Sequence, residues 1–398
     1  MNTISLSPAT VLPDGGIKLS ATLSYGFHSE KQYLIVQAKD KKPQQLTHSG
    51  DVWSIIFLHK MMEVGGQFHI KSTLSKSLWR GIDRYVKAWC QTNPDQYRDI
   101  ELTADELVDD SDSTVKQKAI SCFSGGLDAC FTAYRHAKAL AGPQSLPLKA
   151  CLMLHGADIR KDYVDEWRAA SADARSMVED LGLDFYTIET NFRDMHCDYG
   201  MAYFSMLVGC MRVFEKDFGY LMLGNDGMFT SFLYPHGSNP VTNHFLSSAA
   251  NEIVTDGAEF GRIQKAALVS KWEKGLEKLR VCWQGDNLSS NCGKCAKCKR
   301  TIINFKAVGI DALPCIPALT EEELFDFELT QVEQKEMLPV LEYLEHHPIT
   351  PTPSWVQKLK NKLSAGIQES KPRKRGFFAR LFRRRKKQTP VNIVRPNN

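Results

Sequence analysis

The sequence predicts an α/β protein in which a parallel sheet carries helices on both faces. In the central part of the chain, short apolar runs typical of buried strands alternate with longer stretches of helical periodicity. The first strand-to-helix connection contains the adjacent glycines Gly125 and Gly126, and four cysteines fall within residues 282–298. A content of 43% hydrophobic and 24% charged residues is typical of a globular protein with a sizeable core.

We expect five regions along the 398 residues. They are a β-rich N-terminal domain of unknown role (1–115), the α/β domain (116–280), a four-cysteine zinc-binding segment (281–310), a helical extension (311–365) and a basic tail (366–398). Within the extension, Pro339 is expected to start a helix.

The first region shows strand-like composition at 19–23, 32–37 and 52–58, followed by helical spacing at 78–89. The acidic and polar stretch 105–114 predicts a linker. No catalytic pattern is visible before this linker, so we expect residues 1–115 to be a scaffold or to dock a protein partner.

The α/β domain is predicted from an ordered series of elements. Strands are expected at 119–123, 148–154, 184–188 and 220–223, and helices at 127–140, 163–181 and 201–214. Ligands in such folds bind at the carboxyl ends of the strands. Asp158, Asn225 and Asp226 follow two of these strands and are candidate pocket residues, although Asn and Asp are also common in ordinary turns.

The turn Ser124-Gly125-Gly126-Leu127-Asp128 carries the clearest chemical signal. Two glycines let backbone amides approach a ligand closely, and the helix that follows adds its positive end, so the turn suits a phosphate group. A carboxylate beside phosphate makes sense when Mg²⁺ lies between them, which gives Asp128 a role. The alternative is a plain tight turn capped by Ser124. The chain contains no GxxxxGK[ST] motif of ordinary P-loop nucleotidases.

Arg262 and Lys265 are spaced three residues apart in an expected helix at 259–272. Both side chains would project from one helical face, where a guanidinium and an ammonium together suit phosphate oxygens. The alternative is a solvated helix face.

The cysteines Cys282, Cys292, Cys295 and Cys298 predict a metal site, because CxxCxxC with a further upstream cysteine is typical of tetrahedral thiolate coordination. Zn²⁺ in a structural role is favoured. An iron–sulfur cluster remains the alternative, with Cys315 as a different fourth ligand.

The SGGLD turn resembles the PP-loop of the ATP pyrophosphatases. Together with the later cysteines it resembles the 7-cyano-7-deazaguanine synthase family over about residues 117–307. The resemblance implies a Rossmann-like sheet of the PP-loop ATP-pyrophosphatase type and an ATP-dependent, AMP-forming C–N ligase. In that reaction a carboxylate is adenylated with release of pyrophosphate, and ammonia or an amine displaces AMP.

Residue by residue, the resemblance implies that Ser124, Gly125, Gly126, Leu127 and Asp128 bind ATP and Mg²⁺. A late basic residue of the family reaches the phosphates, which assigns catalytic roles to Asp128, Arg262 and Lys265. The family's usual serine after the aspartate is Ala129 here, and its Tyr-Pro-Asp-Cys segment has only the sequence 234–237, YPHG, as a counterpart. These departures leave the substrate open. The carboxylate can be a small 7-deazaguanine derivative. Alternatively, the acceptor can be a macromolecule, as in longer relatives of the family from bacterial accessory and defence clusters.

Two other functions stay open. One is a PP-loop enzyme that adenylates a tRNA base, and the other is a non-catalytic ATP-binding scaffold subunit. The sequence also leaves homodimer formation open.

The tail concentrates positive charge, since residues 371–387 contain ten Lys or Arg and no acid. The net charge of +4 minus these ten leaves −6 for the remaining chain. Three Phe and one Leu are interleaved with the basic residues, which suits an anionic membrane surface or a nucleic acid. A solvated tail is the alternative. With eleven cysteines and neither a signal peptide nor a membrane-spanning run, we expect a cytoplasmic protein, peripheral to the membrane if the tail binds lipid.

Overall fold

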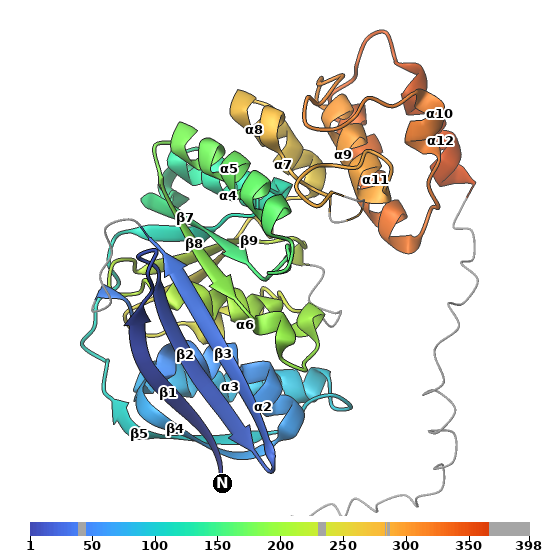
Figure 1. Cartoon of the computed structure of the whole chain (residues 1–398). Helices are drawn as coiled ribbons and strands as arrows, with labels where there is room; N and C mark the ends of the chain where they lie inside the picture. Colours follow the sequence, from blue (N-terminus) through green and yellow to red (C-terminus); the bar gives the residue numbers. More distant parts are fainter. Residues whose placement is uncertain (39–44, 230–235, 283, 285–286, 366–398) are drawn as a thin grey trace, which may run out of the picture.

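The computed structural model describes residues 1–38, 45–229, 236–282, 284 and 287–365, and it has an α/β fold around one ten-stranded sheet (Figure 1). The strands are β1 (Asn2–Val11), β2 (Ile17–Tyr25), β3 (His28–Gln37), β4 (Gly66–Ser75), β5 (Ile100–Val108), β6 (Ala119–Cys122), β7 (Leu148–His155), β8 (Asp184–Thr190), β9 (Tyr220–Gly224) and β10 (Glu252–Asp256). The basic tail at 366–398, with its predicted membrane or nucleic-acid contacts, lies outside the described residues, as do the first two residues of the YPHG segment.

Helices flank the sheet and continue beyond it. They are α1 (Gly50–Ile56), α2 (Leu58–Val64), α3 (Lys76–Thr92), α4 (Leu127–Ala137), α5 (Val164–Asp180), α6 (Tyr199–Arg212), α7 (Arg262–Val269), α8 (Glu273–Lys278), α9 (Ala296–Ala307), α10 (Glu321–Phe325), α11 (Gln331–His346) and α12 (Ser354–Ser364), with short 3-10 turns at Gly142–Gln144, Phe192–Asp194 and Asn243–Leu246.

The sheet order is β10-β9-β6-β7-β8-β3-β2-β1-β4-β5. Strands β10 to β8 in this order are parallel, as the alternation of strands and helices predicts. The chain leaves β6 toward β7 on one side and later returns to β9 on the other side. The carboxyl end of β6 is therefore the point where the strand order reverses, and this is where α/β sheets bind ligands.

The N-terminal region continues this sheet, which differs from the expected separate domain at 1–115. Strand β3 pairs antiparallel with β8, with Leu34 opposite Thr190 and Val36 opposite Ile188. Helices α1 and α6 pack together, and a single hydrophobic cluster contains residues of both regions.

The predicted linker at 105–114 begins inside edge strand β5. Its Asp110 accepts a hydrogen bond from the Ser77 backbone at 3.0 Å, so this stretch is attached to the start of α3. An acidic, polar edge strand has the composition of a linker, which explains the error.

Most of the other predicted elements are confirmed, including strands β2, β3 and β6–β9 and helices α3–α6. The strand predicted at 52–58 is wrong, because α1 and α2 occupy it. Every residue of α1 is buried, so its apolar run carries no periodicity that would reveal a helix. The helix start predicted at Pro339 is also wrong, because this proline lies inside α11.

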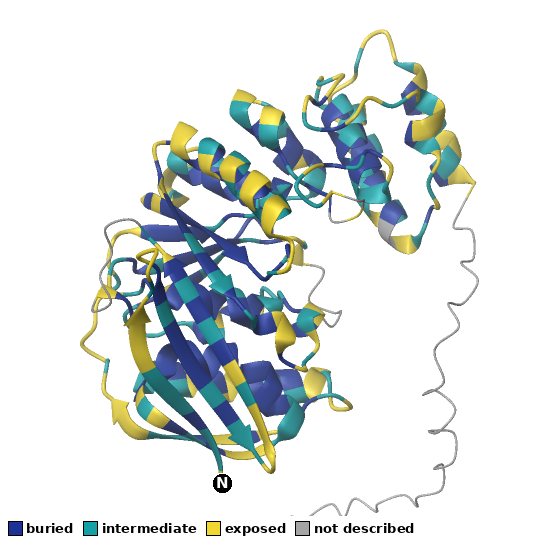
Figure 2. Cartoon of the chain, in the orientation of Figure 1, coloured by how far each residue is buried: buried dark blue, intermediate teal, exposed yellow. Residues whose placement is uncertain are grey.

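Two cores lie on opposite faces of the parallel part of the sheet. Helices α1, α2, α3 and α6 belong to one hydrophobic cluster, and α4, α5, α7 and α9 to the other. A third cluster joins the C-terminal helices α10–α12 to α7 and α9, as the buried helix faces in Figure 2 show. The helical extension is thereby attached next to α7, which carries Arg262 and Lys265.

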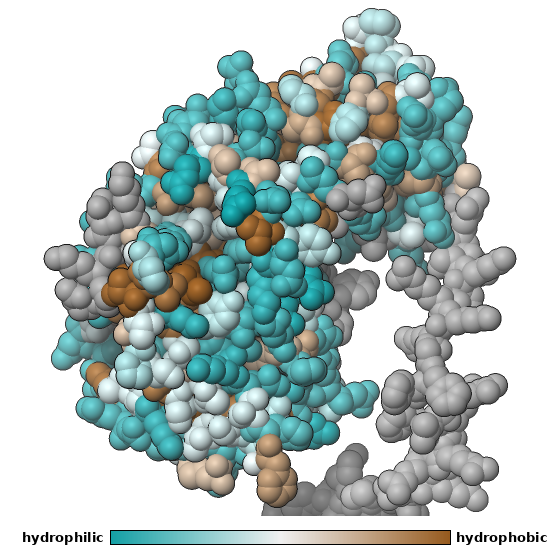
Figure 3. Space-filling view, in the orientation of Figure 1, coloured by the Kyte–Doolittle hydropathy of each residue, from teal (hydrophilic) through white to brown (hydrophobic). Residues whose placement is uncertain are grey.

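The surface in the same orientation is mostly hydrophilic, with hydrophobic side chains in small groups (Figure 3). Among the described residues, no helix combines the length and the apolar character needed to cross a bilayer.

Candidate functional site

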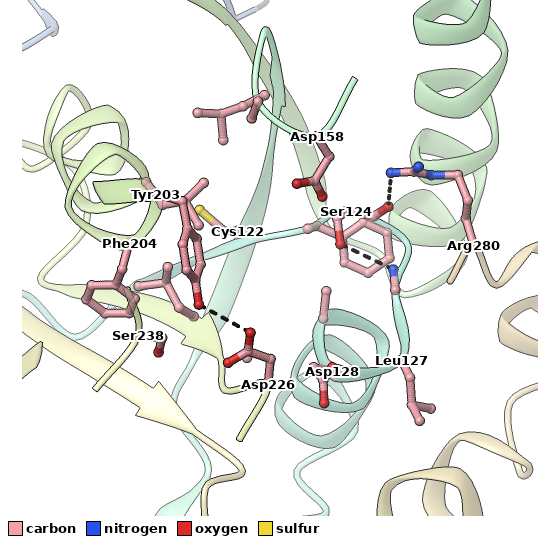
Figure 4. A pocket seen from close by; sticks show the side chains of 18 of the residues that line it. Cys122, Ser124, Leu127, Asp128, Asp158, Tyr203, Phe204, Asp226, Ser238 and Arg280 are labelled. Carbon is pink, nitrogen blue, oxygen red and sulfur yellow. Dashed lines mark hydrogen bonds between the residues drawn. The ribbon is translucent and has the colours of Figure 1, made fainter. Parts of the chain in front are cut away.

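A cavity of about 370 Å³ opens at the carboxyl ends of β6, β7 and β9, where the strand order reverses (Figure 4). It brings together most of the residues predicted from separate turns: Ser124, Gly126, Leu127, Asp128, Asp158, Asp226 and Arg262 line it. Gly125 and Lys265 are adjacent to this group but do not line the cavity. Its other walls are largely apolar, with Phe123, Leu152 and Phe204 among them.

The turn at 124–128, called the glycine turn below, has the geometry that its two glycines predict. Gly125 adopts a φ of +74°, in the left-handed region that side chains disfavour, and the Gly126 N–H donates to Ser124 Oγ at 3.3 Å. Helix α4 begins at Leu127, within this turn. Its unpaired N-terminal amides and the positive end of its dipole therefore lie at the cavity.

Behind the turn, Asp128 is held by the two predicted basic residues. Lys265 Nζ lies 2.7 Å from Asp128 Oδ1, and Arg262 Nη1 lies 3.6 Å from Oδ2. Lys265 is buried and also donates to the Asn225 carbonyl. Burial acts to raise the pKa of Asp128, but Lys265 and Arg262 outweigh it and hold that pKa below its usual value. In this arrangement Lys265 supports the site from behind, while Arg262 reaches the cavity.

Two guanidinium groups at the cavity have unused donors. Arg280 donates from Nη2 to the Ser124 carbonyl at 3.2 Å, yet its buried Nε has no hydrogen-bond partner within the described part of the chain. Arg262 Nη2 is likewise buried without a partner among the described residues, while its Nε faces Glu336 Oε2 of α11 at 3.4 Å. Both residues line the cavity, so their positive charges can act on an anion bound there.

Two further carboxylates, those of Asp158 and Asp226, line the cavity. The Tyr203 hydroxyl donates to Asp226 Oδ2 at 3.2 Å, and His236 Nε2 lies 3.7 Å from the same oxygen (Figure 4). Burial raises the pKa of Asp158 above its usual value, against the opposing effect of Arg280 and Lys297.

The third predicted residue of this group, Asn225, has a structural position. It is buried, and its Oδ1 accepts from Ser238 Oγ at 3.0 Å. Asn225 does not line the cavity, so it holds the chain after β9 in place and leaves ligand contacts to its neighbour Asp226.

The four predicted cysteines form one cluster, with all four Sγ atoms within 4.8 Å of one another. Cys282 Sγ lies 3.3 Å from Cys292 Sγ and 3.7 Å from Cys295 Sγ, and Cys292 and Cys298 are 3.9 Å apart. Tetrahedral Zn–S bonds of about 2.3 Å place sulfurs about 3.8 Å apart, so the donor set fits a single zinc ion. An iron–sulfur cluster would lie between the four cysteine sulfurs, and their Sγ–Sγ distances would then be longer.

Backbone donors prepare these thiols for a metal. The N–H groups of Cys295 and Cys298 point at Cys292 Sγ and Cys295 Sγ, at 3.4 and 3.5 Å. A hydrogen bond from the Cys298 thiol, together with one from the Cys298 backbone, lowers the pKa of Cys295 to about 4, which favours the thiolate that a metal requires. Cys315, the alternative ligand, is not part of the cluster, and its carbonyl accepts from Asn291 Nδ2 at 2.9 Å.

Sequence reasoning missed Tyr203, Arg280 and Lys297 as cavity residues, and it also missed Glu336, which contacts Arg262. Arg280 stands two residues before Cys282, which offered a weak signal that the metal segment returns to the glycine turn. Neither Tyr203, inside an apolar helix, nor Glu336, in the acidic extension, has a spacing that relates it to the turn.

Comparisons with protein-family models, with curated proteins and with solved structures found no match. Function must therefore be inferred from the chemistry of the cavity and of the cysteine cluster.

Proposed function

We propose that the protein is an ATP-dependent, AMP-forming enzyme of the PP-loop type, similar to 7-cyano-7-deazaguanine synthase. It would adenylate a carboxylate, release pyrophosphate, and transfer the acyl group to ammonia or an amine. The observation that carries this proposal is the meeting of the Gly125-Gly126 turn, at the start of α4, with the unsatisfied guanidinium groups of Arg262 and Arg280.

The cationic end of the cavity suits a polyphosphate. Backbone amides at the start of α4 offer donors to phosphate oxygens, and the two arginines add planar charged donors from α7 and from the segment before Cys282. Asp128 is already neutralised by Lys265, so its charge repels a phosphate less than a solitary carboxylate would.

The apolar walls suit planar rings, either adenine or a heteroaromatic carboxylate. Phe123 directly follows β6, Leu152 lies within β7, and Phe204 and Tyr203 line the cavity from α6. The cavity volume is in the range of small-molecule sites, which are concave, mostly apolar and equipped with a few polar groups.

Adenylation would proceed by direct displacement at the α-phosphorus of ATP. A carboxylate oxygen of the substrate forms a bond to the α-phosphorus of ATP, and the bond to the bridging oxygen breaks, so that its electron pair leaves with pyrophosphate. Arg262 and Arg280 would stabilise the charge that grows on the leaving group. An amine then attacks the acyl carbon, AMP departs with the electron pair, and the amine loses a proton. No protein nucleophile is needed in either step.

Mg²⁺, when bound, would neutralise part of the phosphate charge. The resemblance gives Asp128 the role of holding it, but both oxygens of this carboxylate face cations. Asp158 is the better candidate, because its carboxylate lines the cavity and makes no hydrogen bond within the described part of the chain. Oxygen ligands of this kind are those that Mg²⁺ prefers.

The decisive experiment is product analysis by mass spectrometry after incubation with ATP, Mg²⁺ and candidate carboxylates, beginning with 7-carboxy-7-deazaguanine. Formation of AMP and pyrophosphate only when one carboxylate is present would support the proposal. The Arg262→Met variant serves as the control for contaminating nucleotidases. Formation of ADP and phosphate would contradict it. Tight ATP binding without turnover would favour the scaffold subunit, and AMP formation dependent on tRNA would favour the tRNA-modifying enzyme.

A further inference from the structure

Lys297 connects the cysteine cluster with the cavity. It lies between the metal-ligating positions Cys295 and Cys298 and also lines the cavity together with Arg262 and Arg280. A four-thiolate zinc site is usually regarded as a structural staple, since it has no open coordination position. Because Lys297 lines the cavity, the cysteine cluster also contributes a residue to the ligand site.

The position of Lys297 is fixed by the cysteines around it. Helix α9 begins at Ala296, with Cys295 as its N-cap, and the Cys295 sulfur accepts from the backbone of Cys298 at 3.5 Å. Lys297 is the second residue of this helix, so the same turn that gathers the sulfurs sets the direction of its side chain. Loss of the metal would release the turn and with it the lysine.

Within the cavity, Lys297 shares the lining with charged residues of both signs. The groups that act on it electrostatically are Arg262 and the carboxylates of Asp128, Asp158 and Asp226. In an adenylating enzyme the α-phosphate and the substrate carboxylate would meet within this cavity. An ammonium there is placed to contact oxygens of either anion.

The side chains of the other basic residues in the cysteine segment have different surroundings. Lys294 is exposed, Lys299 donates to the Asp326 carbonyl, and Arg300 lies 3.5 Å from Glu333. If the lysines served only to offset the negative charge of a zinc–thiolate unit, an exposed position such as that of Lys294 would suffice. The cavity position of Lys297 is not explained by that role.

We propose that the cysteine cluster is part of the substrate site, where it presents Lys297 as the cation that binds an anionic oxygen, of phosphate or carboxylate, in the cavity. The inference rests on the proposed function for the identity of the ligands. It adds that metal occupancy and ligand affinity are coupled through this one side chain.

The test compares Lys297→Met with Lys294→Met, a matched change in the same segment outside the cavity. Isothermal titration measures binding of ATP, of pyrophosphate and of 7-carboxy-7-deazaguanine, and elemental analysis measures bound zinc. Loss of one charge-assisted contact predicts about tenfold weaker binding in Lys297→Met. Lys294→Met should bind like the original protein, and both variants should retain zinc. Lys297→Arg should recover part of the affinity.

The separate titrations identify the anion that Lys297 contacts. Weaker binding of ATP alone assigns it to phosphate, and weaker binding of the carboxylate alone assigns it to the carboxyl group. Unchanged binding of all three probes, or loss of zinc in Lys297→Met, would overturn the proposal. If the original protein binds these probes and Lys297→Met does not, while no AMP is ever formed, the inference survives although the proposed reaction fails.

Discussion

Asp128, at the start of α4, forms a 2.7 Å ion pair with Lys265 of α7, a residue 137 positions later in the chain. The lysine is buried, and it also donates a hydrogen bond to the carbonyl of Asn225, just after β9. One ammonium thus joins the first helix of the site, a late helix and a strand end. The position of the glycine turn therefore depends on an ion pair with a residue that is distant from it in the sequence.

Asp128→Asn is expected to lower the free energy of unfolding by about 3–5 kcal/mol at neutral pH, because it leaves the buried Lys265 without its anion. The pKa of Asp128 in the folded state is below its ordinary 3.8. Its stabilising contribution is therefore present above that value and is lost as the pH falls through the folded-state pKa. Urea titrations of both proteins from pH 7 downward should show a difference that is constant at first and shrinks below about pH 4. A difference that persists unchanged in acid would exclude the ion pair as its cause.

Glu336→Gln is expected to weaken ATP binding by about fivefold, because Glu336 orients Arg262, which lines the cavity and brings a positive charge to it. Glu333→Gln is the matched control. It removes the ion pair that α11 makes with Arg300 of α9, which does not line the cavity. Fluorescence titration with a nucleotide analogue measures both variants. Tighter binding in Glu336→Gln would show instead that the carboxylate competes with phosphate for Arg262.

Cys295→Ser should lose the metal and lower the melting temperature, because Cys295 both belongs to the cluster and caps α9. Cys315→Ser, outside the cluster, should keep the metal. Elemental analysis and the visible spectrum report the outcome, since zinc–thiolate sites are colourless and iron–sulfur clusters are not. Equal metal content in both variants would show that the ligand set is wrong.

Gly224→Ala should destabilise the protein by about 1–3 kcal/mol and lower its affinity for ATP. A Cβ at this position would lie 2.5 Å from the Asp128 carbonyl oxygen, so β9 and the start of α4 would have to separate. Thermal unfolding and nucleotide titration measure the two effects. As a control, Ala129→Ser changes the neighbouring turn of α4 by one hydroxyl, and it should cost far less stability. If Gly224→Ala melts at the original temperature, the close approach of strand and helix is not needed.

Local sequence patterns predicted the parts of the site whose residues are close together in the sequence. Strand β6, the glycine turn and α4 follow one another in sequence, and the spacing of four cysteines identifies their cluster without knowledge of the fold. The carboxyl-edge rule also placed Asp158 and Asp226 near the turn, because it depends only on strand order.

The remaining contacts join segments whose separation in sequence carries no pattern. Arg280 is joined to the glycine turn by hydrogen bonds to the Ser124 and Gly125 carbonyls, and Glu336 meets Arg262 where α11 packs against α7, neither of which sequence periodicity encodes. The prediction for α1 is wrong for a different reason. This helix is buried on all sides, so its polar and apolar residues follow neither the period of a strand nor that of an amphipathic helix.

The pairing of β3 with β8 also determines the order in which the chain can fold during synthesis. The backbone N–H of Tyr33 donates to Asn191, a residue made 158 positions later. Until the ribosome has released β8, the β3 edge of the nascent N-terminal hairpin remains open, and open edges invite pairing with other chains. Translation speed and chaperone capture over this interval should therefore influence the yield of folded protein more strongly than for an α/β domain whose strands pair with near neighbours.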